Sequence, residues 1–142
     1  MAMRIVVVQS GRLRDAQIIA LRDDYVKRFK RFGSLVVQER EPRDGTALWP
    51  DSSRWKVLVD ERGDQHGSEA FARLIAQWTM RHGEVAFAVG GAFGHDPATS
   101  AGADAHLSLG AMTLPHQLAH VVLIEQVYRA ASILAGTAYH HR

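Results

Sequence analysis

Short apolar runs alternate with longer amphipathic stretches along the whole chain. The short runs are rich in β-branched residues and are bounded by glycine, proline or polar residues, which is typical of buried strands. We predict strands at Ile5–Val8, Leu35–Gln38, Lys56–Asp60 and Val85–Val89, and a further short strand near His106–Leu109. Because helical patterns separate most of these runs, the alternation predicts an α/β fold with a mostly parallel sheet.

Two of the longer stretches have the three- and four-residue apolar spacing of helices with one buried face. The first runs from about Arg14 to Phe32, and Gly33 is expected to end it. The second is expected to start with Ser68 as its N-terminal cap and to continue to about His82. Both stretches fit helices packed on the sheet.

The last predicted helix differs from the others in composition. It is expected to open at Pro115 and to continue to about Leu134, before Gly136. A core helix needs only one apolar stripe, but apolar residues cover well over half of this one. We therefore expect burial on two sides, against the chain's own sheet and against a second copy in a homodimer. These apolar residues are Leu118, Val121, Val122, Leu123, Ile124, Val127, Tyr128, Ala131, Ile133 and Leu134.

Pro42 to Arg54 has few apolar residues and is expected to be a loop. A loop of this length is either an ordered lid over a site or disordered, and the sequence favours neither. Further along, Asp96 is expected to cap a short helix that begins at Pro97.

Composition sets limits on the class of protein. With 142 residues, 46% hydrophobic and 23% charged, the chain fits one soluble domain spanning residues 1–142. The absence of cysteine excludes disulfides, thiolate zinc sites and a cysteine nucleophile. The apolar run at the N-terminus is too short for a signal peptide or a membrane span. We expect a cytoplasmic protein without membrane contact.

The formal net charge of +2 does not by itself argue for a nucleic-acid partner. The basic residues are, however, unevenly distributed. For the basic residues of the first helix, a solvated helix face and a contact with RNA phosphate are equally good explanations. One group lies in the first helix and the other near the C-terminus: Arg22, Lys27, Arg28, Lys30 and Arg31, then Arg129, His140, His141 and Arg142.

Candidate ligand-binding residues lie after three predicted strands, where open α/β sheets bind their ligands. They are Asp60 with Gly63, the turn Gly90–Gly94, and the run Gly110–Pro115. Glycines allow a ligand to approach the main chain directly. Neither GxGxxG nor GxxxxGK[ST] is present. The pattern favours a nucleotide-like ligand that needs no phosphate grip, and S-adenosylmethionine meets that description.

Other chemistries are weaker. His116 and His120 are four residues apart, as in zinc-binding helices, but no glutamate follows His116 and no third ligand is evident, so we expect no metal. No Gly-x-Ser-x-Gly elbow is present. Glu125 and Arg129 have the spacing of a simple intrahelical ion pair.

Several separated motifs together resemble one known family. They are Val59-Asp60 with Gly63, Gly90-Gly91 with Gly94, LSLGAMTLPH at Leu107–His116, EQVYRA at Glu125–Ala130, and the terminal Tyr139-His140. In this order and spacing, over essentially the full chain, they are similar to the RlmH family. These small RNA methyltransferases belong to the SPOUT superfamily.

The resemblance implies an α/β fold with a trefoil knot over about residues 85–142, acting as a homodimer. It implies methylation of N3 of a pseudouridine in 23S rRNA within the assembled ribosome, with no DNA partner and no metal. The methyl donor would be S-adenosylmethionine. By position, its binding residues would be Asp60, Gly91, Gly110, Ala111, Met112, Thr113, Leu114 and Pro115.

Methylation of an imide nitrogen needs mainly alignment of the two substrates and the loss of one proton. The candidate catalytic residues are Arg129, Tyr139 and His140, with Arg129 stabilising negative charge on the base or binding phosphate. The tail from Tyr139 is either a frayed terminus or part of a composite site, in which it meets the target base bound beside the partner's donor.

The sequence departs from the family pattern at three places. Ala92-Phe93 replaces Pro-Glu within the glycine turn, Gly110 replaces a serine, and His120 stands where an arginine is common. These departures leave a second hypothesis open, namely a catalytically inactive knotted protein that binds RNA or the ribosome. Titration with S-adenosylmethionine separates the two, because an inactive binding protein need not retain the donor.

Overall fold

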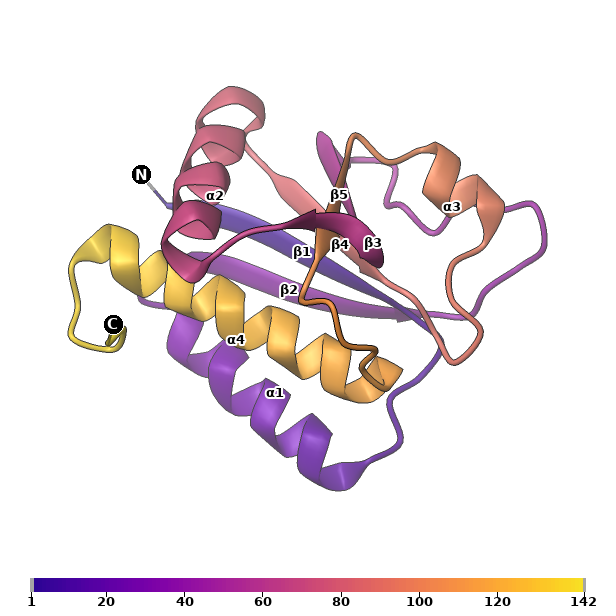
Figure 1. Ribbon diagram of the computed structural model, residues 1–142, viewed down its shortest axis with the longest axis horizontal. Helices are drawn as coiled ribbons and strands as arrows, with labels where there is room; N and C mark the ends of the chain where they lie inside the picture. The colour runs from indigo at the N-terminus through magenta and orange to yellow at the C-terminus, as the bar shows by residue number, and fades with distance from the viewer. Residues whose placement is uncertain (1, 142) are drawn as a thin grey trace.

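A five-stranded sheet with all neighbouring strands parallel forms the centre of the computed structural model, which describes residues 2–141 (Figure 1). The strand order is β2-β1-β4-β3-β5. The α/β prediction with a parallel sheet is confirmed. The strands are β1 (Met3–Ser10), β2 (Gly33–Arg40), β3 (Trp55–Gln65), β4 (Val85–Val89) and β5 (Ala105–Ser108).

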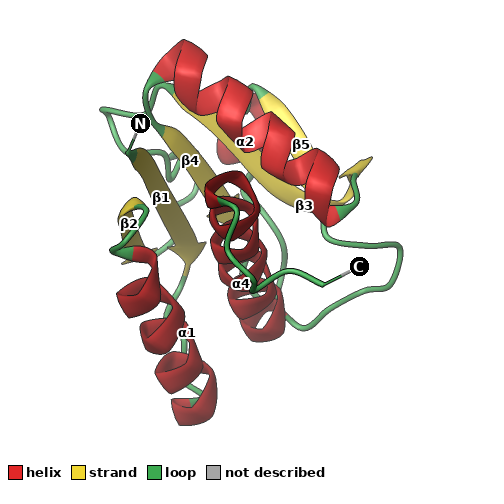
Figure 2. Ribbon diagram, turned by 90° about the vertical axis from the view of Figure 1, so that its left-hand side faces the viewer, coloured by secondary structure: helices red, strands yellow, loops and turns green. Residues whose placement is uncertain are grey.

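Three helices cover one face of the sheet, with α4 between α1 and α2 (Figure 2). Alternate strand residues point towards these helices. Ile5, Val7 and Phe87 are examples, and they pack in a core that includes Phe29 and Leu123. The short α3 lies on the other side. The helices are α1 (Ala16–Phe29), α2 (Ser68–His82), α3 (Pro97–Ala101) and α4 (His116–Ala135).

The loop over residues 42–54 is ordered and covers the second face of the sheet. Trp49 packs with Leu58 and with other strand residues whose side chains point to this second face. Its indole N–H donates to the Thr99 carbonyl at 2.9 Å, and the Leu48 N–H donates to the Thr99 hydroxyl at 3.0 Å. The long loop is therefore part of the core, which explains why it carries two apolar residues in an otherwise polar stretch.

Two predicted helix ends are wrong. α1 stops at Phe29, and Gly33 instead starts β2, where a Cβ would collide with the neighbouring strand. Ser68 is the first residue of α2, but Gly67 is the N-cap and no side chain caps the helix. The Ser68 hydroxyl donates instead to the Gln126 side chain of α4 at 2.7 Å, so it ties two helices together.

α4 begins and ends where the sequence predicts, with Pro115 as N-cap and Gly136 as a left-handed C-cap. Its length and composition would also suit a membrane span, but half of the relevant window is buried within this chain. Contacts with α1, α2 and the sheet bury most of its apolar residues, whereas Leu118 and Leu134 are each 43% exposed. Among the buried residues, Val121 and Ile124 are 5% and 0% exposed. The composition of α4 therefore does not by itself require a second copy, and the homodimer stays a prediction.

Candidate functional site

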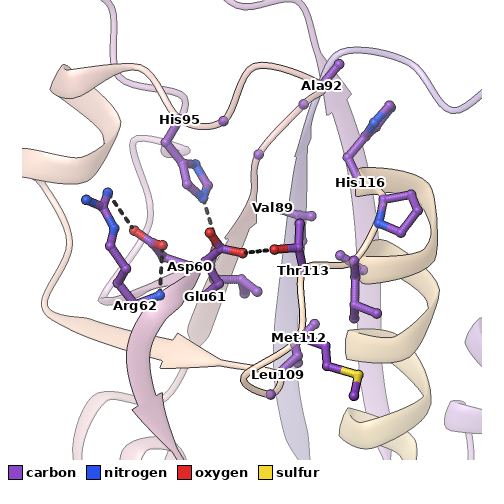
Figure 3. Close-up of a pocket in the computed structure, with 18 of the residues that line it drawn as sticks. Asp60, Glu61, Arg62, Val89, Ala92, His95, Leu109, Met112, Thr113 and His116 are labelled. Atoms are coloured by element: carbon purple, nitrogen blue, oxygen red, sulfur yellow. Dashed lines mark hydrogen bonds and ion pairs between the residues drawn. The ribbon is translucent and has the colours of Figure 1, made fainter.

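A cleft of about 730 Å³ lies where β3, β4 and β5 end (Figure 3). One wall comes from residues 59–62 of β3, a second from the turn after β4, and a third from the loop between β5 and α4. This is the edge at which parallel sheets bind ligands. The three segments that the sequence singled out separately thus meet in one cavity.

Seven of the eight residues predicted to bind the donor line this cleft, and Ala111 does not. The seven are Asp60, Gly91, Gly110, Met112, Thr113, Leu114 and Pro115. The predicted donor site did not include five polar residues that also line the cleft, which are Glu61, Arg62, His95, Ser100 and His116. Glu61 directly follows Asp60, and His95 directly follows the glycine turn, so proximity to the motifs was the available signal.

A break in strand pairing turns the acidic residues into the cleft. β3 runs beyond the predicted end at Asp60, but its register with β5 shifts between Val59 and Asp64. Such a bulge bends the strand and leaves the intervening residues unpaired. Gly63 permits it, because a Cβ there would lie 2.7 Å from the backbone of Leu107 on β5. The glycine of the first motif is therefore needed for a close approach between two strands.

Carboxylates dominate this wall of the cleft. Asp60 accepts a hydrogen bond from the Arg62 N–H at 3.1 Å, and this bond lowers the pKa of Asp60. The Thr113 hydroxyl donates to Glu61 at 2.9 Å, which links β3 to the loop before α4. The carboxyl oxygens of this wall accept hydrogen bonds and so suit a ligand with hydroxyl or ammonium donors, while the Arg62 guanidinium lies 3.6 Å from Asp60.

His95 lies beside the same wall and bonds to the backbone of β3 (Figure 3). Its Nε2 is 2.8 Å from the Val59 carbonyl, so this nitrogen carries the proton and donates. Its Nδ1 is buried and has no hydrogen-bond partner within residues 2–141. Burial lowers the pKa of His95 and keeps the ring neutral. A neutral imidazole with one unused lone pair is able to accept a hydrogen bond.

The loop from Leu109 to Pro115 depends on Gly110, whose φ of +154° side chains rarely adopt. The Ser108 hydroxyl holds it, donating to the Gly110 carbonyl at 2.8 Å and accepting from the Gly110 N–H at 3.2 Å. This conformation gives the glycine, one of the three departures from the family pattern, a local physical reason.

The three predicted catalytic residues lie together at the other end of α4. Arg129 donates to Glu125 at 2.8 Å and to His140 Nδ1 at 3.0 Å. The Tyr139 hydroxyl donates to Glu125 at 2.7 Å and is 2.9 Å from the Tyr25 hydroxyl. We call Tyr25, Glu125, Arg129, Tyr139 and His140 the tyrosine–arginine cluster. Glu125 and Arg129 are thus part of a network rather than a simple ion pair.

The network fixes protonation states. The Glu125 hydrogen bond raises the pKa of Arg129, so the guanidinium stays charged. Burial, followed by the hydrogen bonds to Tyr25 and Glu125, raises the pKa of Tyr139 far above its ordinary value. Tyr139 therefore keeps its proton and acts as a donor. His140 accepts from Arg129, which places its own proton on Nε2, 3.6 Å from Glu69.

The tail after α4 is not frayed over its described part. Tyr139 packs edge-on against Tyr128 at 4.8 Å between ring centroids, and the Arg129 guanidinium lies over its ring at 4.8 Å. His141 is exposed, and Arg142 lies outside the described residues. The alternative of a frayed terminus is therefore wrong for Tyr139 and His140.

None of the three predicted catalytic residues lines the cleft of the same chain. At 1.5 Å per residue, Arg129 lies about 20 Å further along α4 than His116, which does line it. The structure thus gathers the predicted site residues into two groups at opposite ends of one helix.

The two histidines considered as metal ligands do not share a site. His116 lines the cleft, whereas His120 is fully buried and bonded to Gln9. Over residues 2–141, no group of three histidine or acidic side chains is arranged to hold a metal ion.

The chain matches the family model described as "Predicted SPOUT methyltransferase" over residues 3–140. It belongs to this family, which confirms the resemblance and the prediction of a methyltransferase.

Relatives with assigned names agree with this family. The chain is 41% identical over 145 residues to "Ribosomal RNA large subunit methyltransferase H" of Sorangium cellulosum, covering 98% of this chain and 100% of that protein. It is 43% identical over 155 residues to the protein of the same name from Roseobacter denitrificans, covering 97% and 99% respectively.

Proposed function

We propose that this protein transfers a methyl group from S-adenosylmethionine to N3 of a pseudouridine in 23S rRNA of the assembled ribosome. The observation that carries the proposal is the cleft, in which Asp60, Gly91 and the 110–115 loop converge although they are distant in sequence. The printed names of the relatives supply the substrate class, ribosomal RNA of the large subunit.

The residues of the cleft fit the methyl donor. Its volume lies in the range of small-molecule sites. Val89, Leu109 and Leu114 offer apolar contact for an adenine ring. The carboxylates of Asp60 and Glu61 suit ribose hydroxyls and the ammonium group of the donor, and both are compatible with its positive sulfonium charge.

The reaction requires mainly that the protein align its two substrates. When bound, the donor would supply an electrophilic methyl group and leave as S-adenosylhomocysteine, while the imide proton of the attacking N3 passes to water. The permanently charged Arg129 stabilises negative charge on the base as the proton leaves. The raised pKa of Tyr139 makes this residue a hydrogen-bond donor rather than the proton acceptor.

The active unit of the proposal is a homodimer with composite sites. Arg129 lies too far along α4 to reach the cleft of its own chain. Leu118, Val122 and Arg129 follow one another at spacings of four and seven residues, which places them on one face of α4. None of the three is fully buried, and Leu118 is 43% exposed. A partner on this face would bring its cleft towards the tyrosine–arginine cluster.

Two further expectations belong to this proposal. The segment over about residues 85–142 forms the trefoil knot of the superfamily, and the protein acts in the cytoplasm, where ribosomes are. Both follow from the family rather than from a particular contact.

The direct test is calorimetric titration with S-adenosylmethionine, comparing the wild type with Leu114→Arg. Leu114 lines the cleft and is 37% exposed, so arginine is tolerated by the fold but places bulk and positive charge against a cationic donor. We expect affinity to fall at least about tenfold. Met80→Arg is the matched control, because Met80 is 72% exposed on α2 and does not line the cleft.

Failure of the folded wild type to bind the donor would favour the inactive RNA-binding protein instead. A valine at Gly91 is a poorer probe of the cleft, since its Cβ would point at the Ser10 carbonyl, 3.1 Å away. For the dimer, Leu118→Glu should halve the mass found by light scattering. Variants at Val121 or Ile124 would only disturb the core, and a monomeric wild type would remove the composite site.

A further inference from the structure

Two polar side chains with no exposed surface connect α4 to the glycine turn that lines the cleft. His120 of α4 and Gln9 of β1 are both 0% exposed. His120 Nδ1 is 2.9 Å from Gln9 Oε1. Gln9 Nε2 donates to the carbonyl of Gly90 at 3.1 Å, and more weakly to that of Val89 at 3.4 Å. Buried polar groups of this kind are costly unless they are paired.

The hydrogen bonds fix the orientation of both side chains. The amide nitrogen of Gln9 also donates to the Ser10 carbonyl at 3.0 Å, and an oxygen in its place would face only acceptors. Oε1 must therefore face His120, and His120 Nδ1 must carry the proton. His120 Nε2 is buried and has no partner over residues 2–141. The ring is neutral, because burial and then the charge of Arg22 lower the pKa of His120 to about 4.

We propose that His120 and Gln9 are positioning residues for the methyl donor, holding the Gly90-Gly91 turn against the cleft through the Gly90 carbonyl. This inference rests on the proposed function, in that the donor occupies the cleft. Neither residue lines the cleft, so both would act on the donor only through the turn.

The turn needs such support because it has no side chains of its own at these two positions. Glycine has more conformational freedom than other residues, so an unrestrained pair samples many backbone states. Within the turn, the Gly94 N–H donates to the Gly91 carbonyl at 3.0 Å. Gln9 adds the connection to the sheet, since it pairs with Val89 at the end of β4.

Loss of the His120 donor would leave Gln9 Oε1 buried without a partner. An unpaired buried acceptor is unfavourable, so the amide would rotate or shift away from Gly90. Donor binding would then have to order the turn, which weakens affinity without changing the chemistry of the bound state. The signature is therefore a higher donor KM with an unchanged kcat at saturating donor.

The test uses full-length protein with four substitutions. His120→Leu and Gln9→Leu remove the pair, and His120→Gln keeps an N–H donor for Gln9. Ser132→Ala is the matched control, because Ser132 is also buried on α4 but its hydroxyl bonds to the Arg129 carbonyl, at the far end of the helix. Donor affinity is measured by calorimetry and KM and kcat by methylation of ribosomes lacking the modification, while thermal melting confirms the fold.

We expect donor affinity to fall about tenfold in both leucine variants and in their double mutant, which should not be additive. His120→Gln should stay within about threefold of the wild type, and Ser132→Ala should be unchanged. In the wild type, nitrogen NMR should show the Nδ1–H tautomer of His120.

Three outcomes would count against the inference in different ways. A folded His120→Leu with wild-type donor affinity overturns the positioning role alone. An Nε2–H tautomer in the wild type overturns the pair itself, even where the leucine variants fail to fold. A wild type that binds no donor, with the Nδ1–H tautomer present, overturns the proposed function and with it the positioning of a donor.

Discussion

The two ends of α4 are built in opposite ways. At its N-terminal end, the cleft is lined by glycines, a backbone loop and a bulged strand, and it is open to a ligand. At its C-terminal end, the tyrosine–arginine cluster consists of side chains that bond to one another. The cleft can receive a ligand, whereas the cluster consists of charged and phenolic side chains that are already hydrogen-bonded to one another. In the proposed composite site, these two regions are half-sites, and a second copy of the chain completes each of them.

The largest expected effect comes from separating the half-sites in different chains. Leu114→Arg should inactivate the donor cleft, and Arg129→Gln should inactivate the cluster, so each variant alone should methylate poorly. In a mixture, each heterodimer should regain one working site, because the intact cleft of one chain meets the intact cluster of the other. The measurement is methylation of ribosomes that lack the modification.

Mass spectrometry must show that the mixture contains heterodimers. If it does and activity stays absent, the cluster acts within its own chain or not at all. These point variants are preferable to removal of the tail, because Tyr139 bonds to Glu125 and Tyr25 and its loss would also disturb packing.

Arg129→Gln should sharpen the contrast between binding and chemistry. Loss of a charge that stabilises the reacting base should lower methylation about 100-fold. Donor affinity should stay at the wild-type level, because Arg129 is remote from the cleft. Arg129→Lys, which keeps the charge but not the paired geometry with Glu125, should be intermediate. Equal losses of donor affinity and rate would show that the cluster supports the cleft structurally.

The two ends also differ in their response to pH. The raised pKa values of Arg129 and Tyr139 leave both groups protonated through the neutral and acidic range. His120, near the cleft, has its pKa lowered to about 4 in the folded chain. Between pH 6.5 and 4 the unfolded chain binds a proton at His120 that the folded chain does not. The free energy of unfolding should therefore decrease as pH falls, by roughly 1–3 kcal/mol.

Denaturant unfolding at several pH values checks this expectation. The His120→Leu variant should lose that part of the pH dependence. It should keep the part that comes from carboxylates such as Asp60, whose lowered pKa stabilises the folded chain at pH values above the pKa of the unfolded chain. Identical slopes for the wild type and the variant would contradict a buried neutral His120.

The smallest effect is expected for a side chain of the cleft. Thr113→Val removes the hydroxyl that donates to Glu61 but keeps the shape of the residue. The bond lies at an exposed position, so its net value is about 0.5–1 kcal/mol, and donor affinity should change by no more than about fivefold. A loss of donor binding comparable to that of Leu114→Arg would mean that side chains, rather than backbone, form this half-site.

Local patterns predicted the strands, α4 with both of its ends, and the segments of the cleft. These features depend on short-range chemistry, such as the β-branched run of β4 and the glycine after α4. The sequence could not show that Glu125 and Arg129 join Tyr25, because Tyr25 is about a hundred residues away and its contact depends on how α1 packs on α4. The buried state of His120 was hidden for the same reason, since its partner lies on the first strand.

α4 follows all five strands in the chain and also forms the middle of the helical layer (Figure 2). During synthesis, the sheet face that contains Ile5 and Phe87 has only α1 and α2 to cover it until α4 emerges. The contacts that complete the core join the two ends of the chain, an arrangement that slows folding. A chain ended before His116 would be an aggregation-prone fragment rather than a smaller stable domain. Cellular proteases would therefore degrade chains that lack α4.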